Sequence, residues 1–465
     1  MARTERSRSR RSSNHRSSRR SSRRPSRSEK RPRRYELPQY NHNGHEVTKG
    51  IHPDGESGRR GIHPVEFVRI SFRSGNRVSM AVNILWPFVP AAIALYFGTE
   101  NHLWIFILNY IAMVPTANLV GFAGQELARK LPKVIGILLE TTLSSVVEII
   151  LLIVLLKDDS GTDMTPIIQA AILGSILANL LFCLGLVFFV GGLRREEQEF
   201  HGNVSEVGSG LLLVAGFGLL IPSAYSATLS GTLSTAKLEE NVLTISRATA
   251  VILLVAMGVF LYFQLRSHHN IFDEILEADE LKDTDRHKDL KKDKLTLTEA
   301  IVALLIALAL VAMHAVFLVK EIDFIVEEHG VSENFMGLIL VPLVEKAAEH
   351  LTAIDEAWDN QMNFALYHCL GPSIQTALLN APLVVICGWG LNIDMNLNFS
   401  IFMVSLLVLA ILVVGNFLRD GKSNYLEGAL CVLVYVIIGV SAWYYPSDKE
   451  LAESLGSSEE RLIKL

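Results

Sequence analysis

The stretch VPLVEKAAEHLTAIDEAW (residues 341–358) places six ionisable side chains in and beside an apolar segment of membrane length. They are Glu345, Lys346, Glu349, His350, Asp355 and Glu356. An ionised side chain at the centre of a bilayer costs about 2.5–3.5 kcal/mol even on a permissive insertion scale. This concentration of charge therefore predicts a pathway for an ion.

The rest of the chain, 465 residues of which half are hydrophobic, is typical of a polytopic membrane protein. Eleven apolar segments approach or reach the ~20 residues that span a bilayer. They lie at roughly 79–98, 102–123, 133–156, 166–192, 205–226, 243–265, 296–319, 334–354, 362–388, 399–418 and 424–444. We expect an all-α polytopic fold with about 11 transmembrane helices. The four cysteines lie in these segments and are interpreted as packing residues.

The N-terminal region differs sharply from the membrane region. Residues 1–40 hold 15 of the 43 Arg and Lys residues but three of the 48 acidic residues. Because residues 1–70 are also poor in apolar side chains, we expect a disordered, basic, Arg/Ser-rich cytosolic tail. Kinases or anionic lipid are the partners that suit such a tail, membrane lipid surrounds the helices, and nucleic acid is not an expected partner.

Charged loops set the expected orientation. Loops 129–133, 193–195, 266–294 and 419–422 carry basic residues, whereas the alternate loops 158–163 and 321–333 are acidic. The positive-inside rule places the basic loops in the cytosol. The C-terminus then lies on the lumenal or outer side.

Two halves of the membrane region carry matching patterns. Residues 139–153 (LETTLSSVVEIILLI) align with residues 341–355, so that Glu148 matches Glu349. Five helices separate the two equivalents, and an odd number means that the units enter the membrane in opposite directions, which predicts an inverted repeat. The expected regions are the tail at 1–70, an extra N-terminal helix at 79–98, a first five-helix repeat at 102–266, a charged cytosolic linker at 267–295, a second repeat at 296–444 and a C-terminal tail at 445–465.

Glu148 and Glu349 are the candidate ion-binding residues. The helix after each of them carries hydroxyl and amide side chains, among them Asn179 and Gln375. Carboxylate, hydroxyl and amide oxygens are ligands of hard cations, and protons neutralise the same carboxylates. Competition between a cation and protons for these groups predicts antiport, with inorganic cations and protons as substrates and no enzymatic activity or cofactor.

Several segments carry the pattern of a known family. They are ILGSILANLLFCLGLVFFVGGLRREEQEF (172–200), EKAAEHLTAI (345–354), LGPSIQ (370–375) and CGWG (387–390). The chain resembles the calcium/proton exchangers (CAX) of the cation/calcium exchanger superfamily, as a divergent fungal-type member. The resemblance implies ten core helices in two inverted halves plus one extra helix, and export of calcium from the cytosol into the vacuole against protons. It implies cation- and proton-binding roles for Glu148, Ser175, Asn179, Glu349, Ser373 and Gln375.

The chain also departs from the family pattern. Where the family has Gly-Asn before each glutamate, this chain has Ser144-Ser145 and Glu345-Lys346, and Pro372 replaces a serine. Two alternatives to calcium therefore stay open. One is a sodium or potassium/proton antiporter, and the other is a transport-inactive regulatory homologue.

Lys346 and His350 flank the second glutamate. Lys346 lies three residues before Glu349, a spacing at which helical side chains are neighbours. It either steadies a cluster with Glu345 and Glu349 or acts as a tethered cation that takes part of the ion site. His350 is a candidate gate or proton relay, with a hydrogen-bonded packing role as the alternative.

Three further acidic residues lie toward the cytosolic side. Glu140 is about 12 Å from Glu148 along its helix, and Asp355 and Glu356 are about 9–10.5 Å from Glu349. We expect these three residues to form an acidic funnel that attracts cations. The alternative is that Asp355 and Glu356 are interfacial.

Overall fold

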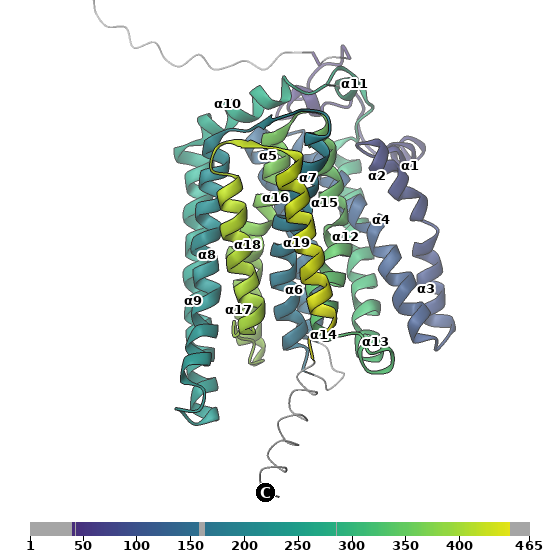
Figure 1. The fold of residues 1–465 in the computed structure, drawn as a ribbon. Coiled ribbons are helices and arrows are strands. Elements are labelled where there is room, and N and C mark those ends of the chain that lie inside the picture. The colour runs from purple at the N-terminus through teal and green to yellow at the C-terminus, as the bar shows by residue number, and fades with distance from the viewer. Residues whose placement is uncertain (1–39, 42, 158–162, 285, 447–465) are drawn as a thin grey trace, which may run out of the picture. The chain divides into compact units, whose positions relative to one another are not determined.

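The computed structural model describes residues 40–41, 43–157, 163–284 and 286–446, and its residues from 40 onward are almost entirely helical (Figure 1). The long or membrane-region helices are α3 (Phe88–Gly98), α4 (His102–Ala128), α5 (Lys133–Leu156), α6 (Thr165–Leu177), α7 (Leu184–Gly192), α8 (Gly202–Leu229), α9 (Thr235–Tyr262), α12 (Leu297–Val319), α15 (Val341–Trp358), α16 (Met362–Gln375), α17 (Ala381–Leu391), α18 (Ile401–Phe417) and α19 (Tyr425–Trp443). Shorter elements are η1 (Pro53–Gly55), α1 (Pro64–Arg73), α2 (Arg77–Val82), η2 (Asn83–Leu85), α10 (His269–Glu280), α11 (Arg286–Lys291), α13 (Ile322–His329) and α14 (Glu333–Phe335). Four π-helical turns are η3 (Ala178–Cys183), η4 (Phe263–Ser267), η5 (Met336–Leu340) and η6 (Thr376–Asn380), and two short strands are β1 (Gln198–Glu199) and β2 (Lys422–Ser423).

The predicted all-α membrane fold is confirmed. Each of the eleven apolar segments falls on a helix, and nine helices of the described chain are long and apolar enough to cross a membrane. Of the other two segments, one is α18, which has 17 residues, and one runs through α15 with its charged side chains. The exact number of crossing helices stays a prediction.

Part of the segment predicted to be a disordered tail has defined structure. Residues 1–39 of that prediction lie outside the described residues, and the expectation of disorder is wrong for part of residues 40–70. The turn η1 and the helix α1 form there, and His52 N donates to Lys130 O at 2.9 Å. Arg59 Nη2 donates to Lys294 O at 2.8 Å, so residues 51–61, here called the N-terminal strap, are held by tertiary contacts that composition does not reveal.

Loops that were predicted to share a side do meet. At the predicted cytosolic end, Lys130 Nζ donates to Leu295 O at 2.8 Å, and Arg194 Nη1 donates to Trp358 O at 2.8 Å. At the opposite end, His102 Nδ1 lies 2.7 Å from Glu321 Oε2. The helices therefore alternate in direction as the sequence predicted. Since Glu140 near the start of α5 and Glu356 near the end of α15 both contact His368, α5 and α15 run in opposite senses.

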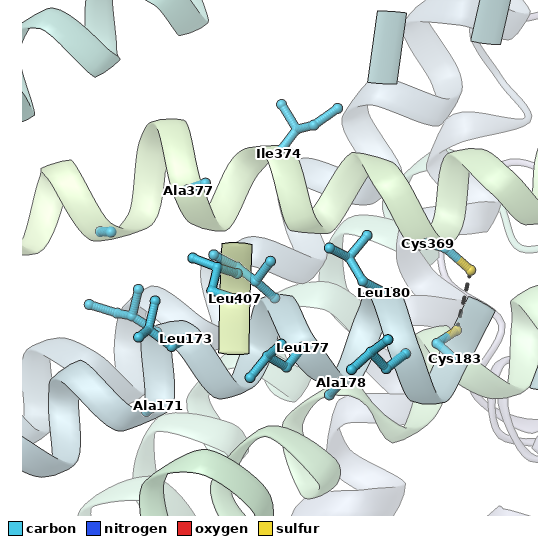
Figure 2. Packing of buried hydrophobic residues seen from close by; sticks show 14 of the residues in the cluster. Ala171, Leu173, Leu177, Ala178, Leu180, Cys183, Cys369, Ile374, Ala377 and Leu407 are labelled. Carbon is cyan, nitrogen blue, oxygen red and sulfur yellow. Dashed lines mark hydrogen bonds between the residues drawn. The ribbon is translucent and has the colours of Figure 1, made fainter. Parts of the chain in front are cut away.

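The two halves repeat one helical construction. In the first half α6, η3 and α7 form one helix with a π-helical turn inside it, and in the second half α16, η6 and α17 do the same. The α6–η3 helix lies beside the α16–η6 helix (Figure 2), and Leu177, Leu180 and Ala377 of these two helices belong to one buried apolar cluster. The main apolar core thus lies between the halves.

A second contact joins the halves at the predicted cytosolic end. The strands β1 and β2 pair antiparallel, with Gln198 opposite Ser423. Below this ribbon α7 and α19 are close-packed, because a Cβ on Gly428 would lie 2.3 Å from Phe189 N and one on Gly192 would lie 2.5 Å from Tyr425 N. We call the ribbon with α7 and α19 the clasp.

The linker between the halves is more ordered than a simple charged loop. Its helix α10 ends beside α16, where the carboxylate of Asp279 accepts from Asn363 N at 2.8 Å and from Phe364 N at 3.2 Å. Burial raises the pKa of Asp279, and the hydrogen bonds from Asn363 and Phe364 offset part of that rise. The linker thereby caps the N-terminus of α16.

Candidate cation site

Close backbone approaches bring the two halves together at the centre of the described chain. A Cβ on Gly174 of α6 would lie 2.3 Å from Leu338 O of η5, and a Cβ on Gly337 would lie 2.6 Å from Ala170 Cβ. Side chains larger than hydrogen would clash at both positions. The π-helical turns η5 and η3 flank these contacts, as such turns frequently do at functional sites.

Glu148 of α5 is buried and receives donors from both halves. Ser175 Oγ donates to Glu148 Oε2 at 3.1 Å, and Thr376 Oγ1 donates to the same oxygen at 2.8 Å. The other oxygen, Glu148 Oε1, has no hydrogen-bond partner among the described residues. A buried carboxylate oxygen without a donor is available to a cation or a proton.

Lys346 lies between the two repeat glutamates. Its Nζ is 2.9 Å from Glu148 Oε2 and 3.7 Å from Glu349 Oε1, and its side chain is 1% exposed. Glu345 is buried next to them, and its Oε2 has no hydrogen-bond partner among the described residues. The structure therefore unites Glu148, Glu345, Lys346 and Glu349 in one cluster, which we call the central site.

His350 links the halves beside the central site. Its Nε2 lies 3.1 Å from Asn179 Oδ1, and both residues are buried. The contact requires a hydrogen on Nε2, because an amide oxygen only accepts. The predicted gating or relay role of His350 stays a prediction.

The two expected ligands of the second half, Gln375 and Ser373, have different partners. Gln375 faces α5, where its Oε1 accepts from Ser145 Oγ at 2.6 Å and its Nε2 donates to Thr141 Oγ1 at 2.9 Å. Ser373 is buried as well, but its hydroxyl donates to Cys369 O of its own helix at 2.9 Å. The structure thus places Gln375 against α5 and gives Ser373 a local partner.

Thr376 is a site residue that the sequence analysis missed. Its Oγ1 lies 2.8 Å from Glu148 Oε2 and 3.4 Å from Ser175 Oγ. The available signal was its position directly after Gln375, at the start of η6. Ser145 was noted as a departure from the family pattern, without a partner.

Toward the predicted cytosolic end, a second cluster joins α5, α15 and α16. His368 of α16 has its Nε2 3.2 Å from Glu140 Oε1 of α5 and its Nδ1 2.9 Å from Glu356 Oε2 of α15. We call Glu140, His368 and Glu356 the mouth cluster. His368 was not among the predicted site residues, since a lone histidine in a helix gives no pattern.

The three predicted funnel residues all line one cavity. Glu140, Asp355 and Glu356 border a space of about 220 Å³ at the predicted cytosolic end. Basic side chains border it too, namely Arg129, Lys133, Arg286 and Lys294. Burial lowers the pKa of Lys294. The cavity is therefore lined by both signs of charge rather than by acidic groups alone.

Inverted helix pairs that enclose buried carboxylates are the arrangement of a membrane transporter for ions. The chain belongs to the sodium/calcium exchanger protein family, whose pattern matches residues 101–266 and 299–444.

Curated relatives fall in the same family. The chain is 36% identical to the vacuolar cation/proton exchanger 5 of Arabidopsis thaliana, over 78% of this chain and 81% of that protein. It is 32% identical to the vacuolar calcium ion transporter of Schizosaccharomyces pombe, over 79% of this chain and 86% of that protein. Among solved structures, native YfkE, a Ca²⁺/H⁺ antiporter protein, matches with a TM-score of 0.64 at 28% identity, covering 78% of this chain and all of YfkE.

Proposed function

We propose that this chain is a cation/proton antiporter of the vacuolar membrane that moves Ca²⁺ out of the cytosol in exchange for protons. One observation carries the proposal: Glu148 and Glu349, one from each half, lie on either side of Lys346 in a buried cluster. The names of the relatives support the vacuole, the cation and the proton. The protein is then a transporter rather than an enzyme, and the ion and the proton are its substrates.

Each group of the central site has a role in this proposal. Glu148 and Glu349 bind either the cation or protons, because a buried carboxylate needs one or the other for charge compensation. Ser175 and Thr376 orient Glu148 by donating to one of its oxygens, which leaves Oε1 for the ion. Gln375 and Asn179 hold the helices of the opposite half in register through their own hydrogen bonds.

Alternating access follows from the inverted repeats at 102–266 and 296–444. In the proposed cycle a pair of helices slides against the rest, and the central site opens to one side at a time. The helix at 79–98 is the extra N-terminal helix, and residues 267–295 are the cytosolic linker. The cavity bordered by Glu140, Asp355 and Glu356 supplies the cytosolic entrance.

A monovalent ion is the second candidate, and the position of Lys346 favours it. The ammonium already supplies one positive charge within 4 Å of both repeat glutamates. A divalent ion must share the site with that charge or displace it, whereas sodium or potassium adds less repulsion. Lys346 thus acts as a tethered cation in this alternative.

Reconstitution of the full chain in liposomes with an imposed pH gradient tests both candidates. Proton-driven uptake of calcium, sodium and potassium is measured for the wild type, Glu148→Gln and Glu349→Gln. We expect each substitution to lower the flux at least about tenfold, because a neutral amide neither binds the cation strongly nor carries a proton. Glu239→Gln, at an exposed position on α9, is the matched control and keeps wild-type flux.

The outcomes separate the alternatives. Calcium uptake that depends on Glu148 and Glu349 supports calcium/proton exchange, and sodium or potassium uptake with the same dependence supports the monovalent alternative. Flux that both substitutions leave intact contradicts the central site. No flux for any ion points to the transport-inactive homologue.

A further inference from the structure

The mouth cluster has the same arrangement as the central site, a basic side chain between two carboxylates, and it lies nearer the predicted cytosolic end. Glu140 lies eight residues before Glu148 on α5, and Glu356 lies seven residues after Glu349 on α15. Because α5 and α15 run in opposite senses, both displacements lead toward the same end, by about 12 Å and about 10.5 Å. His368 lies between the two carboxylates, as Lys346 lies between the repeat glutamates.

The position of His368 beside two carboxylates favours a proton beyond that of a neutral imidazole. Nδ1 lies 2.9 Å from Glu356 Oε2 and 3.1 Å from Phe364 O, and a carbonyl oxygen only accepts, so Nδ1 carries a hydrogen. Nε2 lies 3.2 Å from Glu140 Oε1, which is an ion-pair distance without hydrogen-bond geometry. With a neutral imidazole, two largely buried carboxylates would lie beside it without a positive partner, which is costly. The cluster therefore holds one extra proton, either on the imidazole or on Glu140.

The extra proton lies on the route from the cytosolic cavity to the central site. His368 is 4% exposed, and all three residues of the cluster border the cytosolic cavity. On the inner side Thr141, the neighbour of Glu140, accepts from Gln375 and so connects the cluster to the ligands around Glu148. The mouth cluster lies between the cavity and the central site.

Other ionisable groups surround His368. They are Asp355 and Asp359 at the end of α15, Asp279, Glu280, Asp283 and Asp289 of the linker, the Cys183 thiol of η3, Tyr367 on α16 itself, His52 and Asp54 of the N-terminal strap, and Arg129, Lys133, Arg286 and Lys294 across the cavity. The carboxylates that contact the imidazole directly are Glu140 and Glu356, which makes these two the groups that hold its proton.

We propose that Glu140, His368 and Glu356 form a second proton-binding site, which must release its proton to the cytosol before a cation passes from the cavity to the central site. The step breaks one N–H or O–H bond, water or buffer in the cavity takes the proton, and the cluster becomes more negative by one charge. The net charge of the three groups then changes from −1 to −2, so the cluster attracts a cation more strongly than it did before the proton left. The inference rests on the proposed antiport and adds a place of proton release to it.

Uptake of Ca²⁺ into sealed vesicles with the cytosolic face outward tests the proposal, with Na⁺ used in the same way if Na⁺ is the ion transported. The outer pH is lowered from about 8 to about 5, the range in which imidazole titrates, at a fixed inner pH. Outer protons inhibit wild-type uptake in this proposal. In His368→Gln the midpoint of inhibition falls by roughly 2 pH units, the gap between ordinary imidazole and glutamate carboxyl groups.

Two further variants keep the test decisive. Glu356→Gln retains an acceptor for Nδ1–H but loses the charge that holds the proton, so its midpoint also falls. His314→Gln is the matched control, since His314 is buried with Asn109 rather than with a carboxylate, and it keeps the wild-type midpoint. Wild-type midpoints in both His368→Gln and Glu356→Gln would overturn the proposal.

Failure of the antiport itself gives a different result. If the wild type carries no cation, histidine-selective NMR of the full chain, assigned with His368→Gln, reads the mouth cluster directly. A second imidazole proton that Glu140→Gln removes supports the proton site. If the imidazole is neutral, the carboxyl carbon shift of Glu140 in the same chain reads the other location of the proton. An ionised Glu140 beside a neutral imidazole at about pH 7 overturns the proposal.

Discussion

The ammonium of Lys346 lies within 4 Å of Glu148 and Glu349, and Glu345 is buried beside it. Both interpretations drawn from the sequence, a steadying charge and a tethered cation, are compatible with this geometry. They differ in what an added ion does. A steadying lysine stays in place when the cation arrives, whereas a tethered cation is in competition with it.

Lys346→Met is expected to destabilise the protein by about 3–5 kcal/mol, because it leaves several buried carboxylates without their positive partner. Thermal unfolding of the purified protein measures the loss. Calcium raises the unfolding temperature of the variant more than that of the wild type if the ion takes the vacated place. Lys320→Met, at an exposed lysine that contacts Tyr96, is the control. A variant as stable as the wild type, with no response to calcium, contradicts this role.

Part of the central site followed from the sequence. The pairing of Glu148 with Glu349 could be predicted, because two matched glutamates in oppositely directed helices must meet near the same depth. The partners of hydroxyl side chains could not, since they depend on the rotation of each helix. The Ser373 hydroxyl donates a hydrogen bond to a backbone carbonyl of its own helix, as serine hydroxyls readily do. Thr376 takes the position on Glu148.

At the scale of the elements, the halves contact each other through small residues. Gly174 and Gly337 let α6 and η5 approach closely at reciprocal positions, and Cys183 of η3 lies against Cys369 of α16 (Figure 2). The sequence analysis interpreted the cysteines as packing residues. It gave no indication that two of them meet, because the contact joins segments 186 residues apart.

Gly174→Ala is expected to cost about 1–3 kcal/mol, since the added methyl group would overpack against the backbone of Leu338. Thermal unfolding measures the change, and uptake assays measure the accompanying loss of flux. Gly258→Ala is the control, because no atom lies within 4 Å of its Cβ position on α9. There the substitution is neutral or stabilising by up to ~1 kcal/mol. Equal effects of the two substitutions would contradict the close approach.

Oxidation of Cys183 and Cys369 is expected to stop transport. Their sulfur atoms lie 3.5 Å apart. Diamide takes one hydrogen from each thiol, becomes the hydrazine and leaves a disulfide between the halves. The test uses a chain with Cys387→Ser and Cys431→Ser, follows the cross-link by mass spectrometry, and restores the flux with a reductant.

Cys183→Ser in the same background is insensitive to diamide if the cross-link is the cause. Full flux after complete cross-linking would mean that η3 and α16 do not move relative to each other during the cycle. The proposed sliding of helices would then have to occur elsewhere.

At the scale of the whole described chain, hydropathy predicted the membrane helices but not the order of the polar N-terminal strap. Apolar segments are visible in the sequence because a bilayer requires about 20 of these residues in a row. The N-terminal strap is polar, and its order depends on the contacts of Arg59 with Lys294 and Glu299. Composition therefore predicted disorder where distant loops impose structure.

Asp54→Asn is expected to loosen the strap. A hydrogen bond with His52 and the nearby Lys133 hold the pKa of Asp54 well below its usual range. A depressed folded pKa stabilises the strap above the ordinary value of ~3.9, and the contribution is lost as the pH falls below it. Hydrogen exchange of residues 51–56 is thus faster in the variant at about pH 7, and the difference shrinks below about pH 4.

Asp293→Asn serves as the control for the strap, because Asp293 is largely exposed and its contact with Arg69 is weak. Equal exchange of residues 51–56 in Asp54→Asn and in the wild type at neutral pH would contradict the contribution of the carboxylate.

The clasp has a consequence for how the protein divides mechanically. The strands β1 and β2 and the close-packed helices α7 and α19 belong to different repeats, yet backbone contacts fix one against the other. Helix α7 is therefore attached to α19 of the second repeat, although it continues α6 of the first repeat. The other half of that continuous helix, α6, is held as closely to the second repeat through Gly174 and Leu338. The whole α6–η3–α7 helix is thus fixed by backbone contacts to the second repeat, so the mechanical division of this transporter differs from the division into two sequence repeats.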